Sequence, residues 1–463
     1  RFDNFVYGLL LCELEGLPGL GRAQKQLRNT AALLEGKATI PQVQAKLSLI
    51  REVQTDEFLT SHDLLRFEEM RQELRELIKF LVDGVEGQKP VYTALADPVL
   101  EQTEGKTLDS GYDFGEYRER VNRYIMEHRS DTLVKECKLS SEEIVKKIAD
   151  AGIVGMGGAC FPTQVKLCPP PAFKAECVII NAVECEPYLT ADHQLMLEHA
   201  EEIMVGVTIL MKAVKVNKAF IGIENNKPDA IQLMTKVAST YAGIEVVPLK
   251  VKYPQGGEKQ LIDAIIKRQV AAGALPISTG AVVQNVGTAF AVYQAVQKNK
   301  PLFERVITVT GKSLAKPSNF LARIGTPMKQ LVEACGGLPE DAGKIIGGGP
   351  MMGKALVNTD VPTAKGSSGI LIMNDKEAKR GAIQPCIRCA KCVGACPMGL
   401  EPYLLATVSA HGDFERVEKE DIMSCIECGS CQFTCPSNRP MLDFIRLGKA
   451  KVGAMIRARQ AKK

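Results

Sequence analysis

Two runs of cysteine near the C-terminal end of the chain have the residue type and spacing that most directly indicate chemistry. Each run follows the pattern C-x2-C-x2-C-x3-C, with a proline directly after the fourth cysteine. Closely spaced thiolates in this pattern are ligands of iron–sulfur clusters. We therefore expect two [4Fe-4S] clusters, which transfer single electrons, held by eight residues: Cys386, Cys389, Cys392, Cys396, Cys425, Cys428, Cys431 and Cys435.

Zinc is the alternative occupant of these cysteines, since structural zinc sites commonly take four ligands from two C-x2-C pairs. The third cysteine of each run and the proline after the fourth favour iron–sulfur clusters. The segment also resembles two-cluster ferredoxins, in which the fourth cysteine of each run ligates the cluster of the other run. This resemblance implies that Cys435 joins Cys386, Cys389 and Cys392, and that Cys396 joins Cys425, Cys428 and Cys431.

A second candidate site lies between residues 155 and 187, where the segments GMGGACFPT and NAVECEP occur. Glycines without side chains allow backbone N–H groups to approach a phosphate or a flat ring. Lys166, which follows the first segment, could supply a counter-charge. Taken alone, these features fit a ligand-binding loop or a tight turn in an α/β domain, and both readings remain open at this point.

The elements that position these residues change in character along the chain. Residues 60–82 have apolar positions at helical spacing, which predicts an amphipathic helix. From about residue 140, strand-like runs alternate with helical stretches. We expect a capped helix beginning after Ser140, strands at 177–181, 218–224 and 244–251, and helices near 192–214 and 228–240. This order favours a mostly parallel sheet covered by helices. The pattern of residues 306–353 predicts a small separate α+β module.

Composition excludes several classes of protein. The chain has 463 residues, of which 45% are hydrophobic and 24% charged, as in globular proteins. Its net charge of +4 is too small to indicate a nucleic-acid-binding field. No apolar run approaches the roughly 18 residues that a membrane-spanning helix needs. We therefore expect any attachment to a membrane to depend on a partner or on the protein surface.

Four segments occur in the same order as the FMN-binding segments of the flavoprotein subunit of respiratory complex I, and resemble them. They are GMGGACFPT, NAVECEP, YPQGGE at 253–258 and QNVGT at 284–288. Together with the double cysteine run and a glycine-rich module resembling the soluble-ligand-binding β-grasp (SLBB) domain, they resemble the C subunit of the Rnf electron transport complex over residues 138–446. By motif matching, the resemblance implies a pocket for FMN and nucleotide lined by Gly155, Gly157, Gly158, Lys166, Asn181, Glu184, Gly256, Glu258, Asn285 and Thr288.

The resemblance also implies a function. We expect an electron-transfer subunit of a membrane-associated, ion-translocating ferredoxin:NAD oxidoreductase, with FMN, two [4Fe-4S] clusters and NAD(H) as substrate. The expected partners are the membrane subunits of the complex and, through them, ferredoxin. The chain would lie peripherally on the cytoplasmic side of the membrane. Two alternatives are a cobalamin reductase of a bacterial microcompartment, which shares these cofactors, and a non-catalytic interaction module of a DNA restriction assembly.

The N-terminal region has a different resemblance. Segments such as RFDNFVYGLL and KPVYTALADPVL resemble the helical C-terminal region of the R subunit of type I restriction enzymes. No helicase or nuclease motif accompanies them, so we assign them no DNA chemistry, and no nucleic-acid partner is expected for residues 138–463. The expected organisation is a helical region (1–132), an α/β FMN domain (138–300), an SLBB-like β-grasp module (301–373), an α-helical double [4Fe-4S] domain (380–446) and a basic tail (447–463).

Some residues depart from the complex I pattern. Met156 stands where that motif usually has arginine, and Gly257 and Gly287 replace acidic residues. We therefore expect the contacts to the nucleotide to differ from those of complex I.

Overall fold

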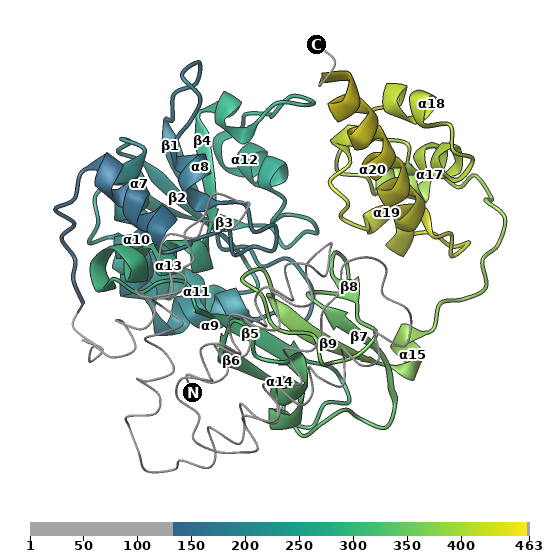
Figure 1. The fold of residues 1–463 in the computed structure, drawn as a ribbon, viewed down its shortest axis with the longest axis horizontal. Coiled ribbons are helices and arrows are strands. Elements are labelled where there is room, and N and C mark those ends of the chain that lie inside the picture. The colour runs from purple at the N-terminus through teal and green to yellow at the C-terminus, as the bar shows by residue number, and fades with distance from the viewer. Residues whose placement is uncertain (1–132, 461–463) are drawn as a thin grey trace, which may run out of the picture. The chain divides into compact units, whose positions relative to one another are not determined.

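The structure, a computed structural model, describes residues 133–460. Apart from 323–326, these residues belong to one compact unit. Along the chain they form an α/β module, a smaller module with a mixed sheet, and a helical module that carries the two cysteine runs (Figure 1). The helix predicted at 60–82 and the rest of the region predicted at 1–132 lie outside the described residues.

A four-stranded parallel sheet forms the centre of the α/β module. Its strands are β1 (Cys177–Asn181), β2 (Ala219–Glu224), β3 (Ile244–Leu249) and β4 (Ala281–Asn285), in the order β3-β2-β1-β4. Val178, Ile179 and Ile180 are fully buried, as expected for a strand covered on both faces. The prediction of a parallel sheet is confirmed. From β1 the chain continues to β2 on one side of it, whereas β4 lies on the other side of β1. The strand order therefore reverses at β1, and ligands of such sheets bind at this switch point, beyond the carboxyl ends of the strands.

Helices cover both faces of this sheet. They are α7 (Ser141–Asp150), α8 (Thr163–Leu167), α9 (Ala191–Glu198), α10 (Ala200–Ala213), α11 (Pro228–Ala238), α12 (Glu258–Ile266) and α13 (Val286–Lys298), with a 3-10 turn, η1, at Pro276–Thr279. The side chain and backbone of Ser140 form a capping box with Glu143, which starts α7 at its predicted position. The single helix predicted at 192–214 is instead two helices, because the backbone leaves helical geometry at His199.

Two packing contacts hold the layers together. On one face α10 lies against α13 so closely that a Cβ on Gly206 would be 2.0 Å from the carbonyl oxygen of Ala289. On the other face, Leu261 and Ile262 of α12 pack against Ile179 in β1. Glycine at 206 is therefore required by the close approach of two helix backbones.

The second module is a β-grasp fold, as predicted. It contains β5 (Glu304–Thr310), β6 (Ser318–Arg323), α14 (Met328–Ala334), β7 (Ala342–Gly347), β8 (Lys354–Ala355) and β9 (Gly369–Asn374). The sheet order is β6-β5-β9-β7-β8, with β5 parallel and β7 antiparallel to β9. Leu331 and Val332 of α14 pack on Ile307 and Ile370.

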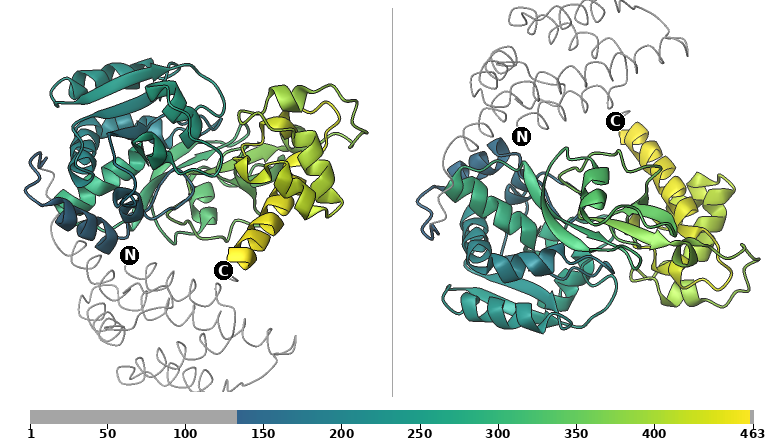
Figure 2. Two further views of the ribbon diagram at one scale, coloured as in Figure 1. Left: turned by 90° about the horizontal axis from the view of Figure 1, so that it is seen from above. Right: turned by 90° about the horizontal axis from the view of Figure 1, so that it is seen from below.

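The third module is helical and follows the short helix α15 (Asp375–Ala378). It contains α16 (Lys391–Gly394), α17 (Pro402–Ala410), α18 (Phe414–Lys419), the 3-10 turn η2 (Ile422–Ser424), α19 (Ser430–Phe433) and α20 (Met441–Gln460). Figure 2 shows α20, in yellow, lying along the other helices of this module. The boundary predicted between residues 446 and 447 falls inside α20, and Val452 is fully buried in the module's core. Residues 447–460 are therefore not a separate tail, because their apolar side packs on the module.

None of the helices among residues 133–460 combines the length and apolar character needed to cross a membrane.

Candidate redox sites

Two asparagines lie at the carboxyl edge of the parallel sheet, where open α/β sheets have their ligand-binding crevice. Asn181 ends β1 and Asn285 ends β4, and they are partners in the sheet register. The Asn181 side-chain amide donates to the carbonyl of Gly256 at 2.8 Å, and the Asn285 amide donates to the Asp192 carboxylate at 2.7 Å. The Asn285 side-chain oxygen also accepts from the N–H of Gly287 and caps α13. Two strand ends, a loop and two helices thus converge here.

The glycine loop at 155–158 lies against this crevice. Its hairpin is closed by the N–H of Gly155, which donates to the carbonyl of Phe161 at 2.8 Å. Gly158 has φ of +109°, and a Cβ placed there would meet nothing within 4 Å. A Cβ on Gly157 would lie 3.6 Å from the Cβ of Asn285, an ordinary contact. The loop therefore presents glycine backbone next to a sequence-predicted pocket residue, with open space beyond Gly158.

Two buried groups hold this loop from beneath. The N–H of Met156 donates to the hydroxyl of Thr288 at 3.0 Å, and the Arg305 guanidinium donates to the Met156 carbonyl at 3.2 Å. Arg305 also donates to the carbonyl of Lys365. Thr288, predicted to line the pocket, is fully buried and acts here on the loop backbone. Arg305 was missed from sequence, although a charged residue in the otherwise buried strand β5 is a signal that could have indicated it.

Lys166 and Glu258, both predicted pocket residues, are brought together. The Lys166 ammonium lies 2.6 Å from the Glu258 carboxylate and also donates to the carbonyl of Val283 at 3.1 Å. Both side chains stay about one-third exposed. The positive charge predicted for an anionic ligand is therefore already shared with a carboxylate of this chain.

Half-buried carboxyl groups lie beside Asn285 at the same edge of the sheet. The Glu184 carboxylate accepts from the N–H groups of Asp192 and His193, at 2.7 and 3.0 Å, at the start of α9. Burial, reinforced by the nearby charge of Asp192, raises the pKa of Glu184 to about 8. Burial also raises the pKa of Asp192, while Lys227 and Arg305 favour its ionised form. Asp192 and Lys227 were not predicted, because local sequence pattern carries no signal of this long-range pairing.

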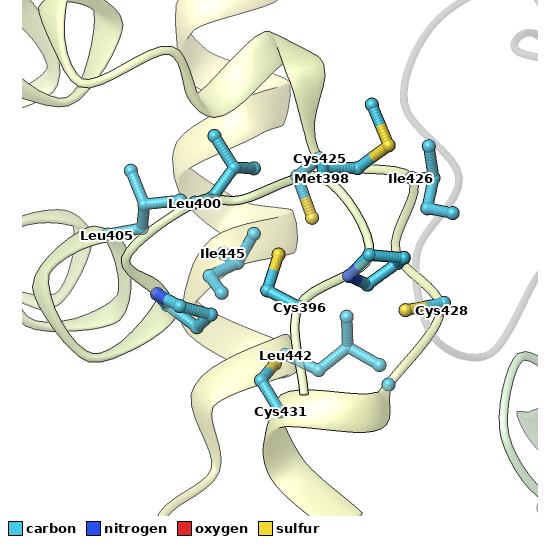
Figure 3. Close-up of a pocket in the computed structure, with 13 residues that line it drawn as sticks. Cys396, Met398, Leu400, Leu405, Cys425, Ile426, Cys428, Cys431, Leu442 and Ile445 are labelled. Atoms are coloured by element: carbon cyan, nitrogen blue, oxygen red, sulfur yellow. The ribbon is translucent and has the colours of Figure 1, made fainter. Parts of the chain in front are cut away.

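The cysteines of the second run gather in a pocket of the helical module. Cys425, Cys428 and Cys431 line it together with Cys396 from the first run. Figure 3 shows the side chains of Cys396, Cys425 and Cys428 directed toward one another. The rest of the lining is mostly apolar, including Leu405. Burial raises the pKa of the thiols of Cys425 and Cys431, and the neighbouring cysteines add to this effect.

The other four cysteines are either exposed or intermediate in exposure. Cys386 and Cys389 are exposed. Cys392 and Cys435 pack partly against the same core, and burial, with a contribution from the charge of Cys435, raises the pKa of the Cys392 thiol. The structure therefore brings Cys435 beside a member of the first run. Within residues 133–460, no three His, Cys, Asp or Glu side chains are close enough to ligate one metal ion. The cysteines of a [4Fe-4S] cluster bind four different irons.

Polar groups surround the cysteine pocket. The N–H of Glu427 donates to the sulfur of Cys425 at 3.4 Å, and Lys449 donates to the Cys425 carbonyl at 2.6 Å. Tyr253, from the α/β module, donates its hydroxyl hydrogen to the Cys428 carbonyl at 2.7 Å. Four thiols in an apolar pocket with nearby N–H groups suit an iron–sulfur cluster, whose potential depends on such hydrogen bonds and on burial.

Comparison with known protein families agrees with this division of the chain. Residues 148–294 match the family described as the Nuo51 FMN-binding domain, residues 306–355 the SLBB domain, and residues 382–436 the 4Fe-4S dicluster domain. The chain therefore contains a flavin-binding domain of the complex I type, a β-grasp module and a domain for two [4Fe-4S] clusters, as predicted.

Curated relatives match over most of the described region. The C subunit of the Na(+)-translocating ferredoxin:NAD(+) oxidoreductase complex of Acetobacterium woodii is 46% identical over 319 residues, covering 69% of this chain and 72% of that protein. The C subunit of the proton-translocating ferredoxin:NAD(+) oxidoreductase complex of Clostridium ljungdahlii is 47% identical, covering 68% and 69%. The C subunit of the ion-translocating oxidoreductase complex of Rhodobacter capsulatus is 43% identical, and the match covers 60% of its length.

A solved structure of an NAD+-reducing [NiFe]-hydrogenase matches 68% of this chain and 63% of its own with a TM-score of 0.48 and 19% identity. The sequence relatives are far closer. At 46% identity across 72% of the Acetobacterium woodii protein, the chain belongs to the family of C subunits of ion-translocating (Rnf-type) ferredoxin:NAD(+) oxidoreductase complexes.

Proposed function

We propose that this chain passes electrons between NAD(H), a bound FMN and two [4Fe-4S] clusters within an ion-translocating ferredoxin:NAD oxidoreductase complex. The observation that carries the proposal is the pairing of a glycine-lined crevice at the switch point of a parallel sheet with a pocket of four cysteines in the same compact unit. When bound, FMN exchanges a hydride with a nicotinamide and single electrons with iron–sulfur clusters.

The residues of the crevice would bind and orient the flavin. Gly155, Gly157 and Gly158 would let the loop backbone approach the phosphate or ring, and Asn181 and Asn285 hold the strand ends that frame it. The remaining proposed pocket residues are Lys166, Glu184, Gly256, Glu258 and Thr288. Of these, Thr288 acts through the loop, since its hydroxyl holds the N–H of Met156.

The eight motif cysteines would divide between two clusters across the runs. One cluster would take Cys396, Cys425, Cys428 and Cys431, the four cysteines of the pocket. The other would take Cys386, Cys389, Cys392 and Cys435, supported by Cys392 and Cys435 packing against the same core, close enough for the charge of one to affect the other. The chain's part in this chemistry is to fix the sulfur positions, exclude water from the first pocket and present N–H groups to the sulfurs.

The proposed setting is a complex with membrane subunits, which the names of the relatives support. Ferredoxin would be reached through those subunits, and the chain would lie peripherally on the cytoplasmic side. The proposed domain limits are 138–300 for the flavin domain, 301–373 for the β-grasp module, and residue 380 through the end of α20 for the cluster domain.

Anaerobic purification followed by flavin, iron and sulfide analysis tests the proposal. We expect about one FMN, about eight irons and about eight sulfides per chain. Stoichiometric zinc with no EPR signal after reduction would contradict it.

A cysteine substitution tests the crosswise division. Cys435→Ser should alter the EPR signal of the cluster assigned to Cys386, Cys389 and Cys392. Cys168→Ser, at an exposed cysteine outside both runs, is the matched control and should leave both signals unchanged. If Cys435→Ser altered only the cluster of the pocket that contains Cys396, each run would bind its own cluster and the crosswise division would be wrong.

A further inference from the structure

Residues 253–260 connect the flavin crevice with the cysteine pocket. Within this segment, the carbonyl of Gly256 accepts from Asn181, and Glu258 pairs with Lys166. All four residues belong to the proposed flavin site. The middle of the segment is therefore fixed to the crevice.

Both ends of the same segment contact the cysteine pocket instead. The Tyr253 hydroxyl donates to the carbonyl oxygen of Cys428 at 2.7 Å. The side-chain amide of Gln260 donates to the sulfur of Met398 at 3.1 Å, and Met398 and Cys428 both line the pocket. One short segment thus makes polar contacts with two loops of the pocket, one of them at the backbone of a proposed ligand.

The Tyr253 contact is supported by a second set of bonds. The Glu186 carboxylate interacts with the Tyr253 hydroxyl and accepts from the N–H groups of Met351 and Met352, at 3.1 and 2.8 Å, in the β-grasp module. The loop with the second cysteine run closes against this point, since a Cβ on Gly429 would lie 2.9 Å from the Met351 carbonyl oxygen. Glycine at 429, with φ of +79°, permits both the turn and the close contact.

We propose that Tyr253 is a positioning residue that seats the Cys425–Cys431 loop on the flavin domain and helps to set the reduction potential of the cluster assigned to Cys396, Cys425, Cys428 and Cys431. This inference rests on the proposed function. The Tyr253 hydrogen bond offsets the partial negative charge of the Cys428 carbonyl oxygen. Without the bond, that charge disfavours the extra electron of the reduced cluster, because hydrogen bonds and local dipoles tune cluster potentials.

Tyr253→Phe tests the inference in the full-length, anaerobically purified holoprotein, because it removes the hydroxyl and keeps the ring. The readouts are FMN and iron content, the thermal unfolding midpoint, and the midpoint potential of each cluster from an EPR-monitored redox titration. Tyr241→Phe is the matched control, since that hydroxyl donates to Glu201 at 2.9 Å within the α/β module.

For Tyr253→Phe we expect full FMN and iron content and a more negative potential for one cluster only. The expected change is up to tenfold in the reduction equilibrium, which is about 59 mV for a one-electron couple. Tyr241→Phe should shift neither cluster. Unchanged potentials in Tyr253→Phe, or equal shifts in both clusters, would overturn the inference. The proposed function would still stand in that case, provided that the protein contained its FMN and iron. A wild-type protein without FMN and clusters would overturn both.

A second variant covers the case in which Tyr253→Phe unfolds. Met398→Leu removes the sulfur that accepts from Gln260 and nearly conserves volume. It should change the potential or EPR line shape of the same cluster and leave the other unaffected. A change in the other cluster alone would contradict the seating of this pocket by residues 253–260.

Discussion

The glycine loop gives the sharpest test of the flavin crevice, because a Cβ added at Gly157 makes only ordinary contacts within the protein. A Cβ at this position lies 3.6 Å from the Cβ of Asn285 and no closer than that to other neighbours. Its φ lies outside the left-handed region. Gly157→Val should therefore change the free energy of unfolding of the flavin-free protein by no more than about 1 kcal/mol.

Flavin binding should respond differently if the backbone of residue 157 approaches the ligand. Forcing extra methyl groups into a well-packed contact costs about 1–3 kcal/mol. At about 1.4 kcal/mol per tenfold change in Kd, the affinity for FMN should fall roughly 5- to 150-fold. The assay is a titration of flavin-depleted protein with FMN, followed by quenching of flavin fluorescence, with cluster content measured on the same samples.

Gly347→Val is the matched control for this experiment. A Cβ on Gly347 also meets only ordinary contacts, the nearest being Leu356 at 3.5 Å, and the residue ends β7 of the β-grasp module. It should bind FMN like the wild type. Wild-type affinity in Gly157→Val would refute the assignment of this loop to the flavin. An equal loss of affinity in both variants would show that the change acts through the fold.

Three further predictions follow from contacts elsewhere in the α/β module. Gly206→Ala should lower the free energy of unfolding by about 1–3 kcal/mol in chemical denaturation, because the new Cβ would lie 2.0 Å from the Ala289 carbonyl oxygen, and an unchanged value would contradict the close packing of α10 on α13. Thr288→Val should cost about 1–3 kcal/mol and weaken flavin retention, since the buried N–H of Met156 loses its acceptor, whereas Thr288→Ser should keep both near wild type. The pKa of Glu184 is raised from 4.5 to about 8, so the folded state favours the neutral carboxyl. The stabilisation that this gives is fully present below pH 4.5 and is lost as the pH rises toward about 8. The free energy of unfolding should fall by at most about 1.4 kcal/mol per pH unit in this range. Glu184→Gln should flatten the pH dependence of the flavin-free protein's thermal midpoint between about pH 5 and about pH 8, and equal slopes in variant and wild type would contradict the buried carboxyl.

The sheet was predictable because three of its strands, β1, β2 and β4, are buried on both faces. A strand such as β1 is a continuous apolar run bounded by polar residues, and its predicted limits, 177–181, agree with the structure. The break at His199 was not predictable, because neither glycine nor proline marks it. On either side of the break the chain makes contacts that a local pattern does not encode: the His199 ring lies 4.6 Å from the ring of Phe290, and the first N–H groups of α9 donate to the Glu184 carboxylate.

The polar residues of the crevice likewise include some that the sequence could predict and some that it could not. Asn181 ends a predicted strand, and Asn285 ends the strand beside it. Both lie in motif segments, so they could be predicted from the sequence as pocket residues. Arg305 bonds to Met156, 149 residues earlier in the chain. Pairing over such a distance depends on how the β-grasp module packs on the α/β module, which no local pattern encodes.

The segment 253–260 has a consequence for how the two sites depend on each other. Gly256 and Glu258 are expected to line the pocket for FMN and nucleotide, yet the ends of the segment, Tyr253 and Gln260, bond to loops of the cysteine pocket. A change in the flavin crevice that displaces this segment must therefore also displace a contact at Cys428. Because the middle and the ends share one short stretch of backbone, a substitution that displaces this backbone should alter the surroundings of both the flavin and one cluster, whereas Tyr253→Phe removes a single hydrogen bond and keeps the backbone in place. Substitutions outside the segment, such as Gly157→Val, separate the two effects.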